Sequence, residues 1–275
     1  MSVVVEQRGR ILVVRIEREA KRNAIDRATA EGLDAALNRL DDDPDLWVGI
    51  VTGTPTIFSA GTDLSAGVDL RTERGGEYGI IRRERSTPLI AAVEGPALGG
   101  GFEIALACDA IIASCTASFG LPETRRGLVA TSGALFRAAR ALPPNIAREL
   151  LISGRTLGPD RAYQLGLVNE VTEAGNALDR AFALAEDICL SSPMSVRESL
   201  RALQALTATE DALGWQVTER AIEVFLASDD MTEGIHAFFE NRPPQWRNER
   251  ATAQVHRACT RPDVADNLVR NHVPR

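Results

Sequence analysis

Lysine is almost absent from this chain of 275 residues, and acidic residues outnumber basic ones. Lys21 is the only lysine, and 31 Lys and Arg face 38 Asp and Glu, which gives a formal net charge of −7 at pH 7. Proteins that bind nucleic acid through their overall charge need a basic surface. We therefore expect no nucleic-acid partner, although this charge does not exclude a local basic pocket.

Cysteine and histidine are also scarce, and their spacing matches no metal or redox motif. The four cysteines form no CxxC pair, and the three histidines are scattered near the C-terminus (Cys108, Cys115, Cys189, Cys259, His236, His256 and His272). Isolated cysteines in apolar or mixed segments are typical of small buried residues in a reducing compartment. We expect no metal site.

Long apolar runs are missing as well. No run reaches the roughly 18 residues that a membrane span needs. The N-terminal segment Met1–Glu6 meets a charge too early for a signal peptide. The sequence therefore predicts a cytoplasmic protein with no membrane partner.

Apolar spacing predicts an α/β core followed by a helical C-terminal part. An N-cap at Asp26 begins a helix that Pro44 ends. Predicted strands cover 3–16 as a hairpin, 47–52, 89–93, 110–113, a short stretch around 119, and the end of 166–171. Further predicted helices cover 77–86, 100–107, 131–141, 145–153, 159–165, 176–191 and 194–206, and a mobile loop covers 65–76. No convincing strand follows residue 193.

The run Gly95–Glu103 is the most informative stretch, because three consecutive glycines follow an apolar strand and open an apolar helix. Glycine lacks a Cβ, so a ligand can approach its backbone closely. The first N–H groups of a helix are unpaired and lie at the positive end of its dipole, so this turn can stabilise an anion. The run has neither GxGxxG spacing nor a following Gly-Lys-Ser/Thr, which argues against a dinucleotide or phosphate loop.

Two glutamates follow the glycine turn along the chain. The helix of Glu103 is apolar on every side, and a buried carboxylate raises its pKa or finds a hydrogen bond. The alternative is a structural Glu103 that pairs with a distant arginine. Glu123 follows Pro122 in a loop, where an ion pair with Arg125 or Arg126 is the simpler interpretation of this residue alone. As partners, the two carboxylates could divide acid and base roles.

The loop Ala60-Gly61-Thr62-Asp63 offers a second candidate donor. The backbone N–H of Thr62 could serve an oxyanion, but a simple Asx turn at Asp63 explains the same residues. The residues alone leave both interpretations open.

In their order and separations, the motifs resemble the crotonase (enoyl-CoA hydratase/isomerase) family over roughly residues 3–250. The matching segments are Arg22-Asn23-Ala24-Ile25, Phe58 to Leu64, Pro88 to Glu103, Ala107-Cys108-Asp109, Phe119 to Glu123 and Gly166-Leu167-Val168-Asn169. The resemblance implies an α/β fold, a spiral of repeated ββα units with a helical C-terminal region. We accordingly expect a core with the active site at 1–192, a helical trimerisation region at 193–250, and a tail or subunit-packing segment at 251–275.

The same resemblance implies an acyl-CoA thioester ligand, no separate cofactor, no metal, and a homotrimer or a hexamer made of two trimers. It assigns the catalytic roles to Glu103 and Glu123, and the oxyanion hole to the backbone N–H groups of Thr62 and Gly100. The residues that would meet the CoA moiety are Lys21, Arg22, Ala24, Ala60, Asp63 and Leu64.

Carboxylates at both glutamate positions are typical of the hydratases in this family. The resemblance therefore implies reversible hydration of a 2-enoyl-CoA to a 3-hydroxyacyl-CoA, in which Glu103 activates the water and Glu123 supplies the proton to Cα. The alternatives are an isomerase with Glu123 as base, another CoA-thioester enolate reaction, and a non-catalytic acyl-CoA-binding subunit. Many members read Gly-x-x-Pro-Gly-x-Gly-Gly after the second glutamate, whereas this chain reads Gly127-Leu128-Val129-Ala130-Thr131-Ser132-Gly133-Ala134. Larger side chains there could reshape the acyl pocket.

Overall fold

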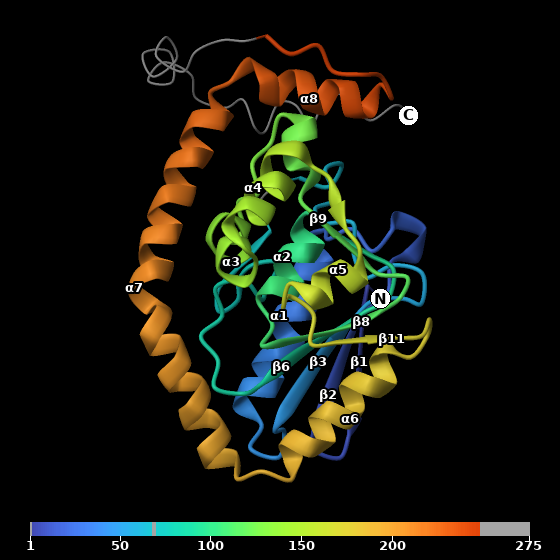
Figure 1. Cartoon of the computed structure of the whole chain (residues 1–275), viewed down its shortest axis with the longest axis vertical. Helices are drawn as coiled ribbons and strands as arrows, with labels where there is room; N and C mark the ends of the chain where they lie inside the picture. Colours follow the sequence, from blue (N-terminus) through green and yellow to red (C-terminus); the bar gives the residue numbers. More distant parts are fainter. Residues whose placement is uncertain (1, 68–69, 248–275) are drawn as a thin grey trace.

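The computed structural model describes residues 2–67 and 70–247, and its core is a six-stranded sheet (Figure 1). The strands, in spatial order, are β1 (Val3–Arg8), β2 (Ile11–Ile16), β3 (Val48–Thr52), β6 (Leu89–Val93), β8 (Ala110–Ser114) and β11 (Glu170–Thr172). β1 and β2 form the predicted antiparallel hairpin, and every later pair is parallel. Parallel neighbours need crossover connections, and these carry the helices of the core.

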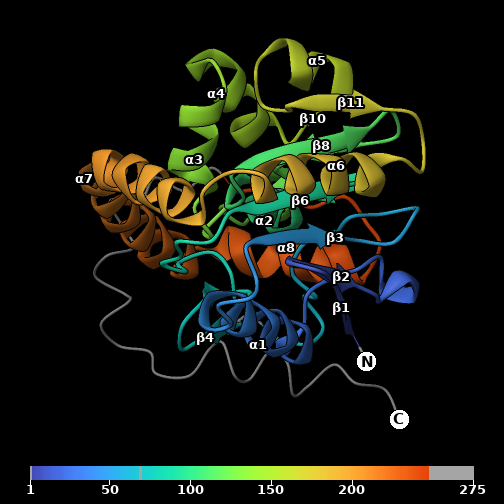
Figure 2. The ribbon, with the colours of Figure 1, turned by 90° about the horizontal axis from the view of Figure 1, so that it is seen from below.

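Helices bury both faces of this sheet (Figure 2). α6 (Ala177–Cys189) covers one face, where Phe182 packs in one cluster with Ile50 and Ile90. α1 (Arg27–Asp42) and α2 (Gly100–Leu106) contribute to the larger core on the other face. β3 and β6 are buried along their whole length, which explains why their sequences are continuous apolar runs.

A second, smaller sheet is built from strands that alternate along the chain with those of the first. It contains β7 (Pro96–Leu98), β9 (Ser118–Gly120) and β10 (Thr156–Leu157). β6 leads into β7 and α2, while β8 leads into β9 and the 3-10 helix η2 (Pro122–Arg126). A parallel bridge between Ser59 and Ala97 places the loop before Thr62 beside β7. This repeat confirms the predicted ββα units, and it brings the Thr62 loop, the glycine turn and η2 close together.

The predicted helix at 77–86 is wrong, because the backbone there turns repeatedly. Gly76, Tyr78 and Gly79 have φ values of 65°, 57° and 77°, in the left-handed region that interrupts a right-handed helix. Gly79 packs so closely on α1 that a Cβ would lie 2.4 Å from the Ala30 carbonyl oxygen. Packing against α1, which local spacing does not reveal, decides the course of this segment.

The remaining elements include most of the other predicted helices, together with short elements that the sequence did not predict. They are the 3-10 helix η1 (Glu19–Lys21), β4 (Arg71–Thr72), β5 (Gly76–Glu77), α3 (Ala134–Ala141), α4 (Pro144–Ser153), α5 (Pro159–Gln164), α7 (Pro193–Leu226) and α8 (Asp229–Phe239). β4 and β5 pair as a short hairpin where the sequence predicted a loop. α7 continues far past the predicted end at 206, through Gly214, whose missing Cβ would lie 2.5 Å from the Phe136 ring.

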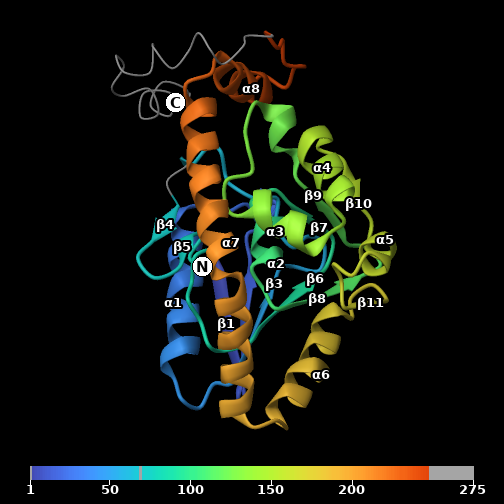
Figure 3. The same ribbon diagram turned by 60° about the vertical axis from the view of Figure 1, so that its left-hand side comes forward.

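The C-terminal helices frame the core. α7 runs along one side of the molecule from α6, and α8 then crosses one end (Figure 1, Figure 3). The described part of the chain after residue 193 is thus helical, as predicted. The predicted tail at 251–275 lies outside the described residues, and the three domain limits stay predictions. Within residues 2–67 and 70–247, no helix is long and apolar enough to cross a bilayer.

Candidate active site

A cavity of about 610 Å³ lies between the glycine turn, η2 and the C-terminal helices. All ten residues that the sequence assigned to catalysis, the oxyanion hole and CoA binding line it, namely Lys21, Arg22, Ala24, Ala60, Thr62, Asp63, Leu64, Gly100, Glu103 and Glu123. They belong to separate segments of the chain, which the ββα repeat brings together. The sequence could connect these segments only through the family resemblance.

Close packing fixes the glycine turn where it lines the cavity. Gly99 has φ 54° and ψ −125°, a conformation that favours glycine, and it turns the chain from β7 into α2. A Cβ on Gly100 would lie 2.6 Å from the Tyr78 hydroxyl, and one on Gly101 would lie 2.3 Å from the Ser59 carbonyl oxygen. Each of the three glycines is therefore required by a different contact or angle.

Thr62 and Gly100 each contribute a backbone N–H at the cavity wall. Their loops are in direct contact, because a Cβ on Gly61 would lie 2.8 Å from the Gly100 nitrogen. Within the described part of the chain, no backbone carbonyl accepts a hydrogen bond from either N–H. Gly100 is also the first residue of α2, where the helix dipole adds partial positive charge.

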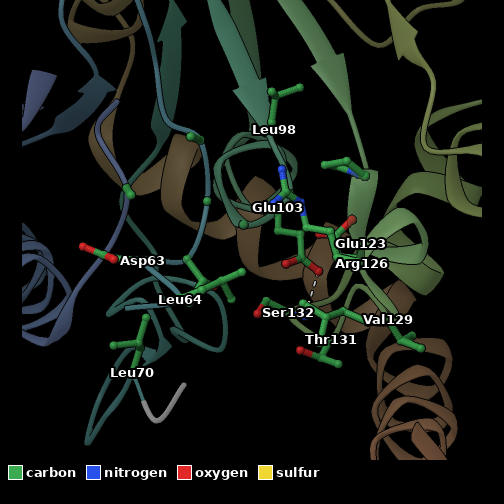
Figure 4. A pocket seen from close by; sticks show the side chains of 18 of the residues that line it. Asp63, Leu64, Leu70, Leu98, Glu103, Glu123, Arg126, Val129, Thr131 and Ser132 are labelled. Carbon is green, nitrogen blue, oxygen red and sulfur yellow. Dashed lines mark hydrogen bonds between the residues drawn. The ribbon is translucent and has the colours of Figure 1, made fainter. Parts of the chain in front are cut away.

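Glu103 lies on α2, one turn beyond Gly100, and its side chain is buried. Its Oε1 accepts a hydrogen bond from the backbone N–H of Ser132 at 2.7 Å (Figure 4). It accepts a second one from the backbone N–H of Ala134 at 3.1 Å. Burial raises the pKa of Glu103, and the two N–H groups oppose that rise because they stabilise the carboxylate. Its hydrogen-bond partners are thus backbone groups rather than the distant arginine of the structural alternative.

Glu123 lies in η2, directly after Pro122, and its side chain lies beside that of Glu103 in the cavity (Figure 4). Its Oε1 lies 3.0 Å from the position that a Cβ on Gly99 would occupy. Its Oε2 is buried and has no hydrogen-bond partner among the described residues. Burial raises the pKa of Glu123, and the nearby charge of Glu103 raises it further.

The two arginines next to Glu123 have other partners. Arg125 Nε donates to the Ser153 carbonyl oxygen at 2.8 Å. The Arg126 guanidinium lies 4.1 Å from the centre of the Phe238 ring, and this contact ties η2 to α8. Among the described residues, Glu123 therefore does not form the ion pair with Arg125 or Arg126 that its sequence neighbours suggested. Its side chain lies in the cavity, beside that of Glu103.

The loop that carries Lys21 and Arg22 is exposed at the cavity, but a buried asparagine holds it from inside. Asn23 is fully buried, and its Nδ2 donates to the Ile57 carbonyl oxygen at 2.8 Å. Its own carbonyl oxygen accepts from the Ser59 hydroxyl at 2.8 Å. Asn23 has φ 51°, a conformation that asparagine tolerates better than most residues. The sequence placed Asn23 in a motif without assigning it this positioning role.

Asp63 lines the cavity, but the protein itself uses its carboxylate. Its Oδ1 accepts from the Ser65 N–H at 3.2 Å and the Ser65 hydroxyl at 2.6 Å, and its Oδ2 lies 3.2 Å from Arg18 Nη2. Partial burial opposes ionisation, but these hydrogen bonds lower the pKa of Asp63 overall. The Asx turn is therefore confirmed, and it coexists with an available N–H on Thr62.

Two groups of cavity residues were missed from the sequence. Tyr78 is 6% exposed, and its hydroxyl oxygen lies 2.9 Å from Thr62 Oγ1. It lies in the segment wrongly predicted as a helix, so no spacing pointed to it. The second group comes from α7 and α8, namely Ile222, Phe225, Leu226, Met231, Phe238 and Phe239. Their concentration of aromatic residues was a usable signal, but we had expected that region to serve trimerisation.

The unusual segment after Glu123 lines the cavity with larger side chains, as expected. Leu128, Val129, Thr131 and Ser132 all contribute to the wall. The backbone of the same segment nevertheless holds the Glu103 carboxylate through Ser132 and Ala134. This segment therefore supplies side chains to the cavity wall and backbone donors to Glu103.

The site brings two backbone N–H groups without a backbone acceptor close to two carboxyl groups with raised pKa values, those of the buried Glu103 and the half-buried Glu123. Such a site can stabilise an enolate while the carboxylates move protons beside it. Among the described residues, no group of three His, Cys, Asp or Glu side chains could hold a metal ion.

Known proteins with the same architecture cover almost the whole chain. The family model described as enoyl-CoA hydratase/isomerase matches residues 6–249. A mevalonyl-coenzyme A hydratase of Aspergillus fumigatus is 38% identical, over 86% of this chain and 91% of that protein. An enoyl-CoA hydratase of Mycobacterium tuberculosis is 36% identical, over 90% of this chain and 97% of that protein.

A solved structure agrees with these relatives. The structure of a carnitinyl-CoA dehydratase from Mycobacterium avium superposes with a TM-score of 0.85 at 40% identity, covering 90% of this chain and 99% of that one. This superposition and the ββα repeat point to the same fold as the motifs around the two glutamates. The chain therefore belongs to the enoyl-CoA hydratase/isomerase, or crotonase, family.

Proposed function

We propose that this protein catalyses the reversible addition of water to the double bond of a 2-enoyl-CoA, giving a 3-hydroxyacyl-CoA. The observation that carries this proposal is a pair of carboxylates, the buried Glu103 and the half-buried Glu123, which line one cavity together with Thr62 and Gly100. The names of three similar proteins support the proposal, because two are called hydratases and one a dehydratase.

The two backbone donors would act on the thioester. Hydrogen bonds from Thr62 and Gly100 to its carbonyl oxygen withdraw electrons from the conjugated double bond, so C3 becomes open to attack. As water adds, negative charge develops on that oxygen, and donors already in place stabilise it without reorganisation. The reaction changes no oxidation state, so the scheme uses no redox cofactor, and the backbone donors take the role that a metal could otherwise have.

The surroundings of the glutamates assign their roles. The carboxylate of Glu103 is stabilised by two N–H groups, so it is the base that removes a proton from the attacking water. Glu123 loses its proton less readily than Glu103, because burial and the charge of Glu103 both favour the neutral form of Glu123. It is the acid that gives its proton to C2. The oxygen of water bonds to C3, and the pair ends with its proton on Glu103.

The CoA moiety would enter past Lys21 and Arg22. These cationic side chains are exposed at the cavity, beside the backbone of Ala24, Ala60 and Leu64. Arginine and lysine suit phosphate groups of a nucleotide. The Asp63 carboxylate is paired with Arg18, so Asp63 would contact the CoA moiety through its backbone.

Two properties stay predictions, namely a cytoplasmic location, which follows from the sequence, and a homotrimer or a dimer of trimers, which follows from the resemblance. Exposed apolar side chains along α7 fit such an assembly, and they include Leu203, Leu206, Leu213 and Val217.

An isomerase that moves the double bond is the second candidate, because Glu123 Oε2 is unpaired in the described residues and one free base suffices for that reaction. An absorbance assay on purified protein separates the two. Loss of the conjugated enoyl-thioester absorbance from a 2-enoyl-CoA is the result that we expect. Its appearance from a 3-enoyl-CoA, without hydration of the 2-enoyl-CoA, would show an isomerase. Tight acyl-CoA binding without either reaction would show a binding subunit.

A further inference from the structure

Tyr78 places a phenol hydroxyl next to the proposed oxyanion hole. Its hydroxyl oxygen lies 2.9 Å from Thr62 Oγ1. Its ring lies flush against the first turn of α2, since a Cβ on Gly100 would lie 2.7 Å from Tyr78 Cζ. Ser132 and Glu103 also lie near enough to influence its ionisation, and burial raises the pKa of Tyr78, so the phenol stays protonated at neutral pH.

The backbone of this segment adopts an energetically unfavourable conformation. Tyr78 has φ 57°, a left-handed conformation that is a genuine outlier for a bulky residue. The glycines on both sides of the pair Glu77-Tyr78 also have positive φ, at Gly76 and Gly79. Close contact of Gly79 with α1 holds the turn in place. Strain of this kind persists where the surrounding structure enforces it, and it is concentrated at functional sites.

The wall of the cavity that Tyr78 lines is apolar over most of its area. Leu70, Leu98 and Val129 line it, together with the apolar residues of α7 and α8. In such pockets a few well-placed polar groups fix the orientation of the ligand and its specificity. A phenol can take part in three hydrogen bonds, and the bonds to Thr62 and to the Ser132 side chain use two of them. The Tyr78 hydroxyl can therefore serve a ligand without losing its internal partners.

We propose that Tyr78 contacts the acyl group and selects acyl-CoA thioesters that carry an oxygen substituent, a hydroxyl or a carbonyl, close to the thioester. The inference rests on the proposed function, because it takes the acyl chain to extend from the oxyanion donors past Glu103. A plain hydrocarbon chain would leave the remaining hydrogen-bonding capacity of the buried phenol unused, whereas an oxygen-bearing chain would satisfy it.

The test compares Tyr78→Phe with the wild type on a matched substrate pair, 2-butenoyl-CoA and 4-hydroxy-2-butenoyl-CoA. The substitution keeps the ring and removes only the hydroxyl. Tyr163→Phe is the control, because Tyr163 on α5 is 55% exposed and does not line the cavity. We expect wild-type kcat/KM to favour the hydroxylated substrate by about 10- to 100-fold. In Tyr78→Phe, kcat/KM should fall for the hydroxylated substrate alone, so that the preference disappears. Tyr163→Phe should retain the preference.

Three results overturn the proposal: no preference in the wild type, a preference that survives Tyr78→Phe, or an equal loss on both substrates. The last result would place the phenol at the thioester rather than at the acyl substituent. Dissociation constants for the unreactive pair butanoyl-CoA and 4-hydroxybutanoyl-CoA, measured by calorimetry, give a second readout. If the wild type hydrates neither enoyl substrate, the proposed function fails, and the binding preference with its dependence on Tyr78 still decides the role of this residue.

Discussion

Glu103 and Glu123 are the same residue type, but the atoms around their carboxylates differ. Glu103 accepts two backbone hydrogen bonds, while Glu123 leaves Oε2 unpaired among the described residues. Burial raises both pKa values, and the charge of Glu103 acts in addition on Glu123. The pair therefore favours a state with one proton, which resides on Glu123. That state is the one that the proposed water addition needs at its start.

Replacing Glu123 with Gln should stabilise the fold at alkaline pH. A carboxyl whose folded-state pKa is raised binds its proton more tightly in the folded protein than in the unfolded chain. The wild type therefore has its full stability below the unfolded pKa of about 4.3 and loses it as pH rises through the raised folded-state pKa. Because Gln cannot ionise, Tm of Glu123→Gln at pH 9 should exceed that of the wild type by about 2–8 °C.

Thermal melts of both proteins between pH 4 and pH 9 measure this effect. Glu186→Gln is the control, because Glu186 lies exposed on α6 and its substitution should leave Tm nearly unchanged across the range. Equal Tm profiles for the wild type and Glu123→Gln would show that Glu123 is not held in its neutral form.

α8 forms one wall of the cavity because it packs tightly on η2. A Cβ on Gly234 would lie 2.0 Å from the Arg126 carbonyl oxygen, and one on Gly127 would lie 2.2 Å from the Asp230 carbonyl oxygen. The stacking of Arg126 on Phe238 adds to this contact. Both clashes would involve backbone atoms, so neither glycine can be replaced without moving α8 away from η2.

Replacing Gly234 with Ala should therefore open the cavity. The helix must shift to make room for the methyl group, so we expect a loss of about 1–3 kcal/mol in the free energy of unfolding and a several-fold rise in KM for the acyl-CoA substrate. Denaturant unfolding and steady-state kinetics measure the two effects. Gly158→Ala is the matched control, because a Cβ there would meet no atom within 4 Å. Unchanged KM in Gly234→Ala would mean that α8 does not shape the binding site.

Local spacing predicted elements well where burial alone determines them. The apolar runs of β3 and β6 are buried throughout, and the N-cap at Asp26 accepts from the Thr29 N–H as expected. The segment 77–86 was predicted wrongly, because contacts with α1 decide its course. The end of α7 was also misplaced, since its second half contains Gly214 and is stabilised by packing against α3.

The whole molecule builds its cavity from parts that are distant in the sequence. The family resemblance predicted the two glutamates, the two donors and the CoA-binding backbone, all of which line one cavity. It could not predict the remaining wall, formed by Tyr78 and by residues of α7 and α8. The predicted residues follow one another in short motifs with fixed spacing. The others reach the cavity through a strained turn, which leaves no local pattern, and through the end of α7 and through α8, where only the concentration of aromatic residues was a signal.

The central claim is that both glutamates take part in water addition. Its most direct test is the kcat for hydration of a 2-enoyl-CoA by Glu103→Gln and Glu123→Gln, with the dissociation constant of a saturated acyl-CoA as the measure of an intact site. The account predicts that each variant loses about 10²–10⁴-fold in kcat while binding the saturated acyl-CoA within a few fold of the wild type. Near-wild-type turnover by either variant would contradict it.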